Sequence, residues 1–139
     1  MHTGSAFLRC RFRRTRLFGA AFVGCKLTGS VFEEAELRPL RVEGGDWSYV
    51  RLRRADLRGV SFRGVRLAEA DLTDADLSGC DLRDADLSYA TLRGANLDGA
   101  DLRGAAVAGV DLAALRLAGA VIDVAQAVQV ARGLGAVVE

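Results

Sequence analysis

Apolar side chains recur at every fifth position of this chain, from Phe7 to Ile122. We call these positions centres. The 24 centres hold 15 Leu, five Phe, two Val, one Trp and one Ile. Two residues before each centre the side chain is usually small, and 11 of these 24 positions hold Ala. Because side chains alternate between the two sides of an extended chain, both positions point the same way. The pattern therefore predicts short extended units that face a common core.

The remaining two residues of each unit are expected to form a corner. The second of them is Gly at 12 of 24 places. Glycine there fits a type II turn, whose second central residue has a positive φ. A corner in every unit predicts a square coil made of four units, because Leu and Ala fill a coil of that width and would leave a wider one hollow.

The stretch "ADLSGCDLRDADLSYATLRGANLDGADLRGA" resembles the A(D/N)LXX signature of the pentapeptide-repeat proteins, and the resemblance covers Ser5 to Ile122. It implies an all-β solenoid, a right-handed quadrilateral β-helix of about six coils. The segments "GSVFEEAELRPLRVEGGDWSYVRLRRADLRG" and "IDVAQAVQVARGLGAVVE" are similar to the mycobacterial fluoroquinolone-resistance members of this family. That similarity implies binding to DNA gyrase, a type II topoisomerase, by mimicry of duplex DNA, and dimerisation through the C-terminal ends.

The five-residue register stops after Ile122, and the period changes in "DVAQAVQVARGLG". Asp123 and Gln126 have the spacing of a helix N-cap and its N3 partner, and Gly133 or Gly135 can end the helix. The sequence thus predicts a β-helix over residues 1–122 and a C-terminal capping helix with a tail over residues 123–139. One face of this helix is apolar and comprises Val124, Ala127, Val128, Ala131 and Leu134.

Two arrangements of the apolar helix face are open: it covers the last coil of its own chain or that of a neighbour. A helix this short is marginal alone in water and needs tertiary packing. A two-fold arrangement would satisfy both copies with one surface, so we expect a homodimer. The expected dimer interface comprises Leu112, Leu117, Ile122, Val124, Val128, Ala131 and Leu134.

The formal net charge of +1 conceals an uneven distribution. Residues 1–66 hold 14 Lys and Arg against six Asp and Glu, whereas residues 67–139 hold five against 12. Duplex DNA carries about one negative charge per 1.7 Å of its axis, so only the second half is acidic enough to offer a short DNA-like patch. The candidate partner-binding acids are Asp56, Asp71, Asp74, Asp76, Asp81, Asp84 and Asp101.

Folding the sequence into coils of four units places these acids on three different sides of the coil. It also stacks Arg63, Arg83 and Arg103 beside Asp81 and Asp101, where the arginines are expected to neutralise much of that side.

Two further functions are open. The chain could be a solenoid scaffold for another protein, or its arginine-rich first half could contact nucleic acid. Glu33, Glu34 and Glu36 interrupt the basic stripe, so direct nucleic-acid binding is not expected.

Other chemistry finds little support in the sequence. The one histidine is His2, and no nucleophile and base can be paired, so a non-enzymatic protein is expected. Cys10, Cys25 and Cys80 lack metal-ligand spacing and fall at small core positions, and no cofactor is expected. No apolar run could span a bilayer and no signal peptide is visible, so we expect a cytoplasmic protein without membrane contact.

Overall fold

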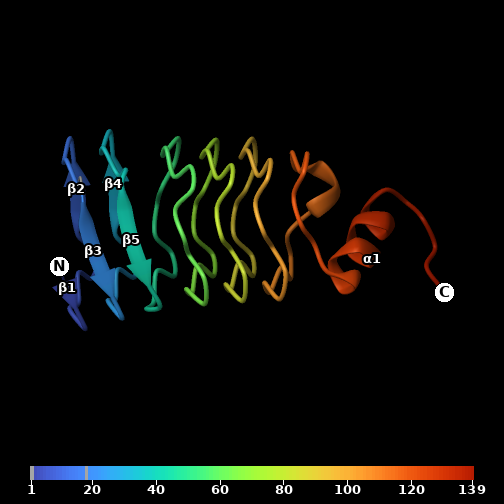
Figure 1. Ribbon diagram of the computed structural model, residues 1–139, viewed down its shortest axis with the longest axis horizontal. Helices are drawn as coiled ribbons and strands as arrows, with labels where there is room; N and C mark the ends of the chain where they lie inside the picture. The colour runs from blue at the N-terminus through green and yellow to red at the C-terminus, as the bar shows by residue number, and fades with distance from the viewer. Residues whose placement is uncertain (1, 18) are drawn as a thin grey trace.

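The computed structural model describes residues 2–17 and 19–139. The chain winds into a rod, with β1 at one end and the one α-helix of the described residues near the other (Figure 1). After β5, successive coils are joined by single-residue bridges in place of longer strands. The elements are β1 (His2–Thr3), β2 (Arg11–Arg13), β3 (Ala20–Val23), β4 (Val31–Glu33), β5 (Leu40–Glu43), the 3-10 helix η1 (Leu112–Ala114) and α1 (Val124–Gly133).

Successive coils pair in parallel, and each residue lies opposite the residue four units further along the chain. In the sheet of β1, β3 and β5, His2 lies opposite Phe22 and Phe22 opposite Val42. The same step continues through the bridges, where Asp81 lies opposite Asp101. Four sides, each one unit long, therefore make one turn, and the predicted right-handed quadrilateral β-helix is confirmed.

Each unit uses its backbone groups in the same way, as the unit around Leu77 illustrates. The amide of Leu77 donates to the carbonyl of Asn96 in the next coil (2.8 Å), and the amide of Gly79 donates to that of Asp98 (2.9 Å). The amide of Cys80 closes the corner by donating to the carbonyl of Leu77 (3.1 Å). Adjacent coils are thus bonded along most of their perimeter, and one exception in the described chain is the side of residues 91–95, which faces η1 in the last coil.

The core is a stack of apolar layers inside this frame. Leu77 and the centres above and below it, Leu57 and Leu97, are fully buried. Near the N-terminal end the leucines give way to aromatic rings, and Trp47 stacks on Phe32 with ring centroids 6.0 Å apart.

Two of the cysteines fill small core positions as expected. Cys25 and Cys80 are buried free thiols, and the Cys80 thiol donates to the carbonyl of Leu57 (2.9 Å). Burial raises the pKa of Cys80 to about 12, so the thiol stays protonated and unreactive.

The corners contain the positive φ angles that glycine was expected to supply, for example +67° at Gly79. Among the described residues, nine other than glycine share this conformation, and Asp74 has a φ of 57°. The neighbouring coil-to-coil bonds hold these residues in a region that side chains normally avoid.

The predicted C-terminal helix is present and begins as the sequence indicated. Asp123 accepts a hydrogen bond from the amide of Gln126 (2.9 Å), and the Gln126 side chain accepts one from the amide of Asp123 (3.1 Å). The helix ends at Gly133, where a side chain would press on Ala113 of η1 (2.9 Å). No helix of residues 2–17 and 19–139 is both long and apolar enough to cross a membrane.

The face that α1 turns toward its own last coil combines Val130, which packs against the core, with buried polar side chains, which the sequence analysis did not anticipate. Gln126 is only 3% exposed, and its Nε2 donates to the carbonyls of Leu102 (2.5 Å) and Ala105 (3.1 Å). Inside the rod, a carbonyl at the Ala105 position accepts an amide from the next coil, as Cys80 does from Asp101 (3.0 Å). Gln126 replaces that missing amide at the end of the stack.

Gln129 repeats the arrangement one turn later, donating to the carbonyls of Val107 (3.1 Å) and Val110 (2.6 Å). Two residues of the apolar stripe, Val124 and Leu134, are 81% and 73% exposed, whereas Val128 and Ala131 are half-buried. The stripe therefore covers its own last coil only in part, and its covering by a neighbour stays a prediction.

We predict that Leu77→Asp prevents folding, because a carboxylate would be buried without a partner at a cost of more than about 4 kcal/mol. Ala106→Asp is the matched control: Ala106 faces solvent at the outward position where aspartate is common. Thermal unfolding followed by circular dichroism measures both. A Leu77→Asp protein that melts like Ala106→Asp would contradict the assignment of the core.

Candidate partner-binding surface

Five of the seven candidate acids stand immediately before a centre, and at this position the carboxylate serves the backbone. Asp76 Oδ1 accepts the amide of Ser78 (3.1 Å), and Asp81 Oδ1 accepts that of Arg83 (3.1 Å). The coil-to-coil bonds leave this amide without a backbone acceptor in the described chain. The side chain closes an Asx turn in its place. The same bond is made by Asp56, Asp71 and Asp101.

Sequence reasoning missed this role, although a signal for it was present. Asn96 occupies the same position as these aspartates and accepts the amide of Asp98 (3.0 Å). An uncharged residue that alternates with aspartate indicates that the shared property is the acceptor oxygen, and the negative charge is secondary.

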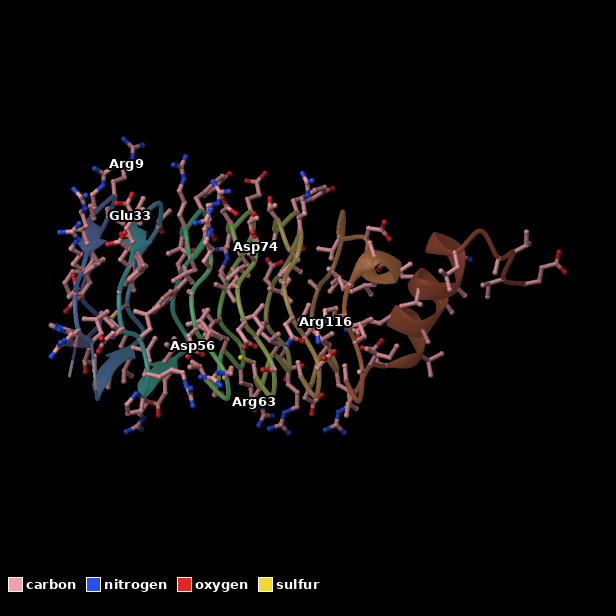
Figure 2. All side chains as sticks on the ribbon, turned by 90° about the horizontal axis from the view of Figure 1, so that it is seen from above. Arg9, Glu33, Asp56, Arg63, Asp74 and Arg116 are labelled. Atoms are coloured by element: carbon pink, nitrogen blue, oxygen red, sulfur yellow. The ribbon has the colours of Figure 1, made fainter. Side chains whose placement is uncertain are left out.

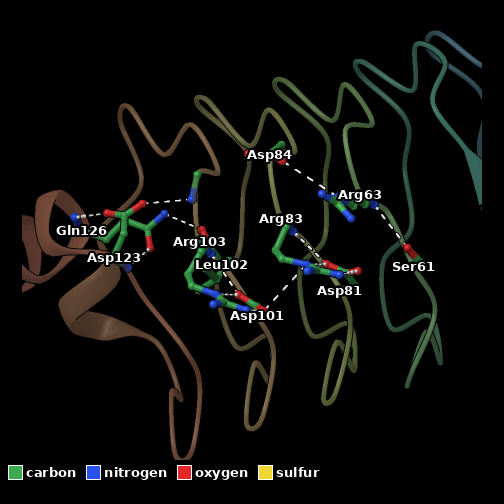
Figure 3. Close-up of polar contacts among 11 residues, drawn as sticks. Ser61, Arg63, Asp81, Arg83, Asp84, Asp101, Leu102, Arg103, Asp123 and Gln126 are labelled. Atoms are coloured by element: carbon green, nitrogen blue, oxygen red, sulfur yellow. Dashed lines mark hydrogen bonds and ion pairs between the residues drawn. The ribbon is translucent and has the colours of Figure 1, made fainter.

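Arginines lie close to six of the seven acids. Arg103 binds Asp101 with both ends of its guanidinium, at 3.0 Å from Nε to Oδ1 and 2.6 Å from Nη2 to Oδ2 (Figure 3). Arg83 lies 2.8 Å from Asp81 and 3.8 Å from Asp101, so it links two coils. The expected neutralisation by stacked arginines is thus present. The other pairs join Arg58 to Asp56 and Asp76, Arg53 to Asp71, and Arg63 to Asp84.

Asp74 differs from the other six. It is exposed at a corner, and no Lys or Arg nitrogen of the described residues lies within 4.0 Å of its carboxylate. Its carboxylate lies over Gly94 of the next coil, where any Cβ would clash with it. Asp74 is therefore the one candidate acid whose charge is free in the described structure.

The seven acids lie on three sides of the rod. We name the four sides by their stacked outward residues: face A holds Lys26 and Asp46, face B holds Arg51 and Asp71, face C holds Asp56 and Asp76, and face D holds Asp81 and Asp101. In Figure 2, Asp74 lies in the upper half of the rod and Asp56 in the lower half. The structure therefore does not gather the candidate acids into one patch.

The arginine contacts also shift the acidity of the paired carboxyl groups. The side-chain hydrogen bond from Arg58 lowers the pKa of Asp56 to about 2, and that from Arg103 lowers the pKa of Asp101 to about 2. The pKa of Asp81 is lowered in the same direction by Arg83. These groups are ionised and paired over the whole physiological range of pH.

The residues expected at a dimer interface divide into a buried and an exposed group. Leu112 is fully buried inside its own chain, and Leu117 and Ile122 are half-buried. Val124 and Leu134 stand out in solvent. Two further exposed residues at this end, Val121 and Val137, escaped sequence reasoning because they lie outside the helix face.

A metal site is not visible in residues 2–17 and 19–139, where no group of three His, Cys, Asp or Glu side chains is arranged to hold an ion.

We predict that Arg103→Gln raises the pKa of Asp101 from about 2 toward its ordinary 3.8, which a carboxyl NMR titration would follow. Because folding lowers this pKa, the stability that the pair contributes is present above pH 3.8 and lost as the pH falls through about 2. Arg93→Gln, which removes an arginine without a carboxylate partner, should leave the pKa unchanged. An Asp101 pKa that stays at about 2 in Arg103→Gln would contradict the assigned cause.

Comparison with known proteins places this rod among others of its kind. The family model for pentapeptide repeats matches residues 3–38, 42–74, 66–104 and 80–114. The pentapeptide repeat protein MfpA of Mycobacterium tuberculosis is 48% identical over 47 residues, which are 34% of this chain and 26% of MfpA. The match thus spans about a quarter of that relative's length.

Solved structures agree with the family match. A trypsin-treated form of QnrB1, a plasmid-mediated fluoroquinolone resistance protein, superimposes with a TM-score of 0.84 and 25% identity, over 97% of this chain and 66% of QnrB1. A pentapeptide repeat protein from the cyanobacterium Cyanothece 51142 shares the fold, with a TM-score of 0.55 and 18% identity over 88% of this chain and 86% of that one. This chain is therefore a member of the pentapeptide repeat family.

Proposed function

We propose that this chain is a non-enzymatic protein that binds DNA gyrase or a related type II topoisomerase and protects it from fluoroquinolones. The observation that carries the proposal is the similarity to QnrB1, described as a plasmid-mediated fluoroquinolone resistance protein, at a TM-score of 0.84 over 97% of this chain. The local similarity to MfpA supports it.

The proposed contact includes the acidic half of the rod, as a partial mimic of duplex DNA. Residues 67–122 hold ten Asp and Glu against four Arg. Most of the candidate acids share their charge with an arginine, so the free negative charge is smaller than this difference. The free carboxylate of Asp74 and its neighbours Asp71 and Asp76 are the part of the acidic half that we expect to matter most.

A supercoiling assay with purified gyrase, with and without a fluoroquinolone, tests the proposal. We expect this protein to change the supercoiling rate or to restore activity in the presence of the drug. No change in either arm, at a protein concentration well above micromolar, would contradict the proposed function.

Replacing Asp71, Asp74 and Asp76 together with Asn tests the charge-based contact. Asn keeps the oxygen that accepts the turn amide, as Asn96 does, so the fold is retained while the charge is lost. We expect about tenfold or more of this variant to be needed for the same effect on gyrase, because its affinity is lower. Replacing Arg9, Arg11 and Arg13 with Gln is the control and should leave the effect in place. The opposite pattern would assign the contact to the basic half.

We further propose a homodimer through the C-terminal ends. The exposed side chains of Val124 on α1, of Leu134 directly after it, and of Val121 and Val137 in the same C-terminal segment are apolar and would be covered by a second copy. Sedimentation equilibrium on the parent and on Val124→Glu would measure this association.

We expect the parent to be a dimer and Val124→Glu to be a monomer. A glutamate in the first turn of a helix stabilises the helix, so we expect Val124→Glu to fold normally. The control is Leu8→Glu, at an exposed leucine of the opposite end, which should remain dimeric. A parent that is monomeric at high micromolar concentration would contradict the proposal.

A further inference from the structure

The arginines of faces C and D and those of face B differ in their partners. Every arginine of faces C and D lies within 4.0 Å of a carboxylate, from Arg16 to Arg116. On face B and its corners, three of the arginines are paired in this way, to Glu33, Glu34 and Asp71. The arginines there without a carboxylate of the described residues within 4.0 Å are Arg9, Arg13, Arg51, Arg54 and Arg93.

Three of the unpaired arginines of face B line a groove. This hollow of about 540 Å³ has Arg13, Arg51, Arg53 and Arg54 in its lining, against two carboxylates, Glu33 and Glu34. Its apolar lining includes Val31 and Ala55, which are half-buried. The groove thus combines cationic groups with an apolar surface that solvent reaches.

A second hollow of about 520 Å³ continues the groove across the corner between faces A and B. It shares Val31 and Arg51 with the first and extends to Arg9 and Tyr49, with the carboxylates of Glu69 and Asp71 also in its lining. The ring of Tyr49 is exposed. Tyrosine and arginine around an apolar centre are the side chains that contribute most to protein–protein binding energy.

We propose that face B binds an acidic, partly apolar segment of a partner protein, with its carboxylates on the unpaired arginines and its apolar side chains over Val31 and Ala55. This proposal does not depend on the partner's being gyrase.

The spacing of the charges favours such a segment over nucleic acid. Coils repeat about every 4.8 Å, so Arg13, Arg53 and Arg93, which stack at every second coil, are about 9.6 Å apart. Arg13 and Arg93 are unpaired, whereas Arg53 lies 3.8 Å from Asp71 and would be shared with it. Glu33 lies between Arg13 and Arg53, and Asp74 is next to the position between Arg53 and Arg93. A continuous phosphate backbone would meet these carboxylates at every second coil. A peptide in the polyproline II conformation has three residues per turn and advances about 9.3 Å per turn, so acidic side chains at every third position lie on one side, reach the arginines and avoid the carboxylates.

Fluorescence anisotropy with a labelled synthetic peptide tests the proposal on the full chain. The probe has Glu at every third position with Leu between, and the comparison probes are the same peptide with Lys in place of Glu and a short DNA duplex. We expect the parent to bind the Glu peptide and not the Lys peptide. Binding to the duplex that is tighter than to the Glu peptide would overturn the proposal in favour of nucleic acid.

Two variants locate the binding. The double variant Arg51→Gln with Arg54→Gln should lower the affinity for the Glu peptide by about tenfold or more. The matched double variant on face D, Arg83→Gln with Arg103→Gln, should change that affinity by less than about twofold. Equal losses in the two pairs, or no binding by the parent at millimolar peptide, would overturn the proposal.

Val31→Asp provides a test that removes no arginine. Val31 lies opposite Arg51 in the neighbouring coil, in the column where Asp71 already occurs, so the fold accepts the new carboxylate. It would pair with Arg51 and occupy the apolar groove, and binding should fall by about tenfold or more. Circular dichroism checks that the variant is folded. Unchanged binding by folded Val31→Asp would place the peptide away from face B.

Discussion

The structure depends on the backbone hydrogen bonds that join each coil to the next at a fixed step of four units. Because the step is constant, every side chain lies above and below residues of the same type of position. Leucines such as Leu57, Leu77 and Leu97 form one continuous core, and small residues fill the space between the columns. An extra or missing residue would shift all later side chains. The regularity of the sequence is therefore a condition for the rod to form.

The same constraint explains much of the surface charge. Four of the five amides in a unit find backbone acceptors, and the fifth is accepted by the side chain before the centre, as Asp76 accepts Ser78. The carboxylates used in this way are then balanced by neighbouring arginines such as Arg103. Faces C and D are consequently close to neutral in their contacts, although they are rich in charged residues. Free charge is found at Asp74 and around the groove of face B, where we place the contacts with partners.

Much of the fold could be predicted from the sequence, because a period of five with apolar centres admits few arrangements. The start of α1 was also accessible, since Asp123 and Gln126 form a local pair. The side of α1 that packs was not, because hydrophobic periodicity identifies an apolar face but not what it meets. The last coil presents open carbonyls, so Gln126 and Gln129 face it and Val124 does not. The acids were assigned to a partner for a similar reason: counting charges does not reveal which are held by the backbone.

The central claim is that the aspartates before the centres serve the fold first and a partner second. Backbone amide exchange at Ser78, measured by NMR in the parent, in Asp76→Asn and in Asp76→Ala, tests it most directly. The account predicts that the Ser78 amide is protected in the parent and in Asp76→Asn, which both offer an acceptor oxygen, and exchanges faster in Asp76→Ala while the core amide of Leu77 stays protected. Equal protection of Ser78 in all three proteins would contradict the claim.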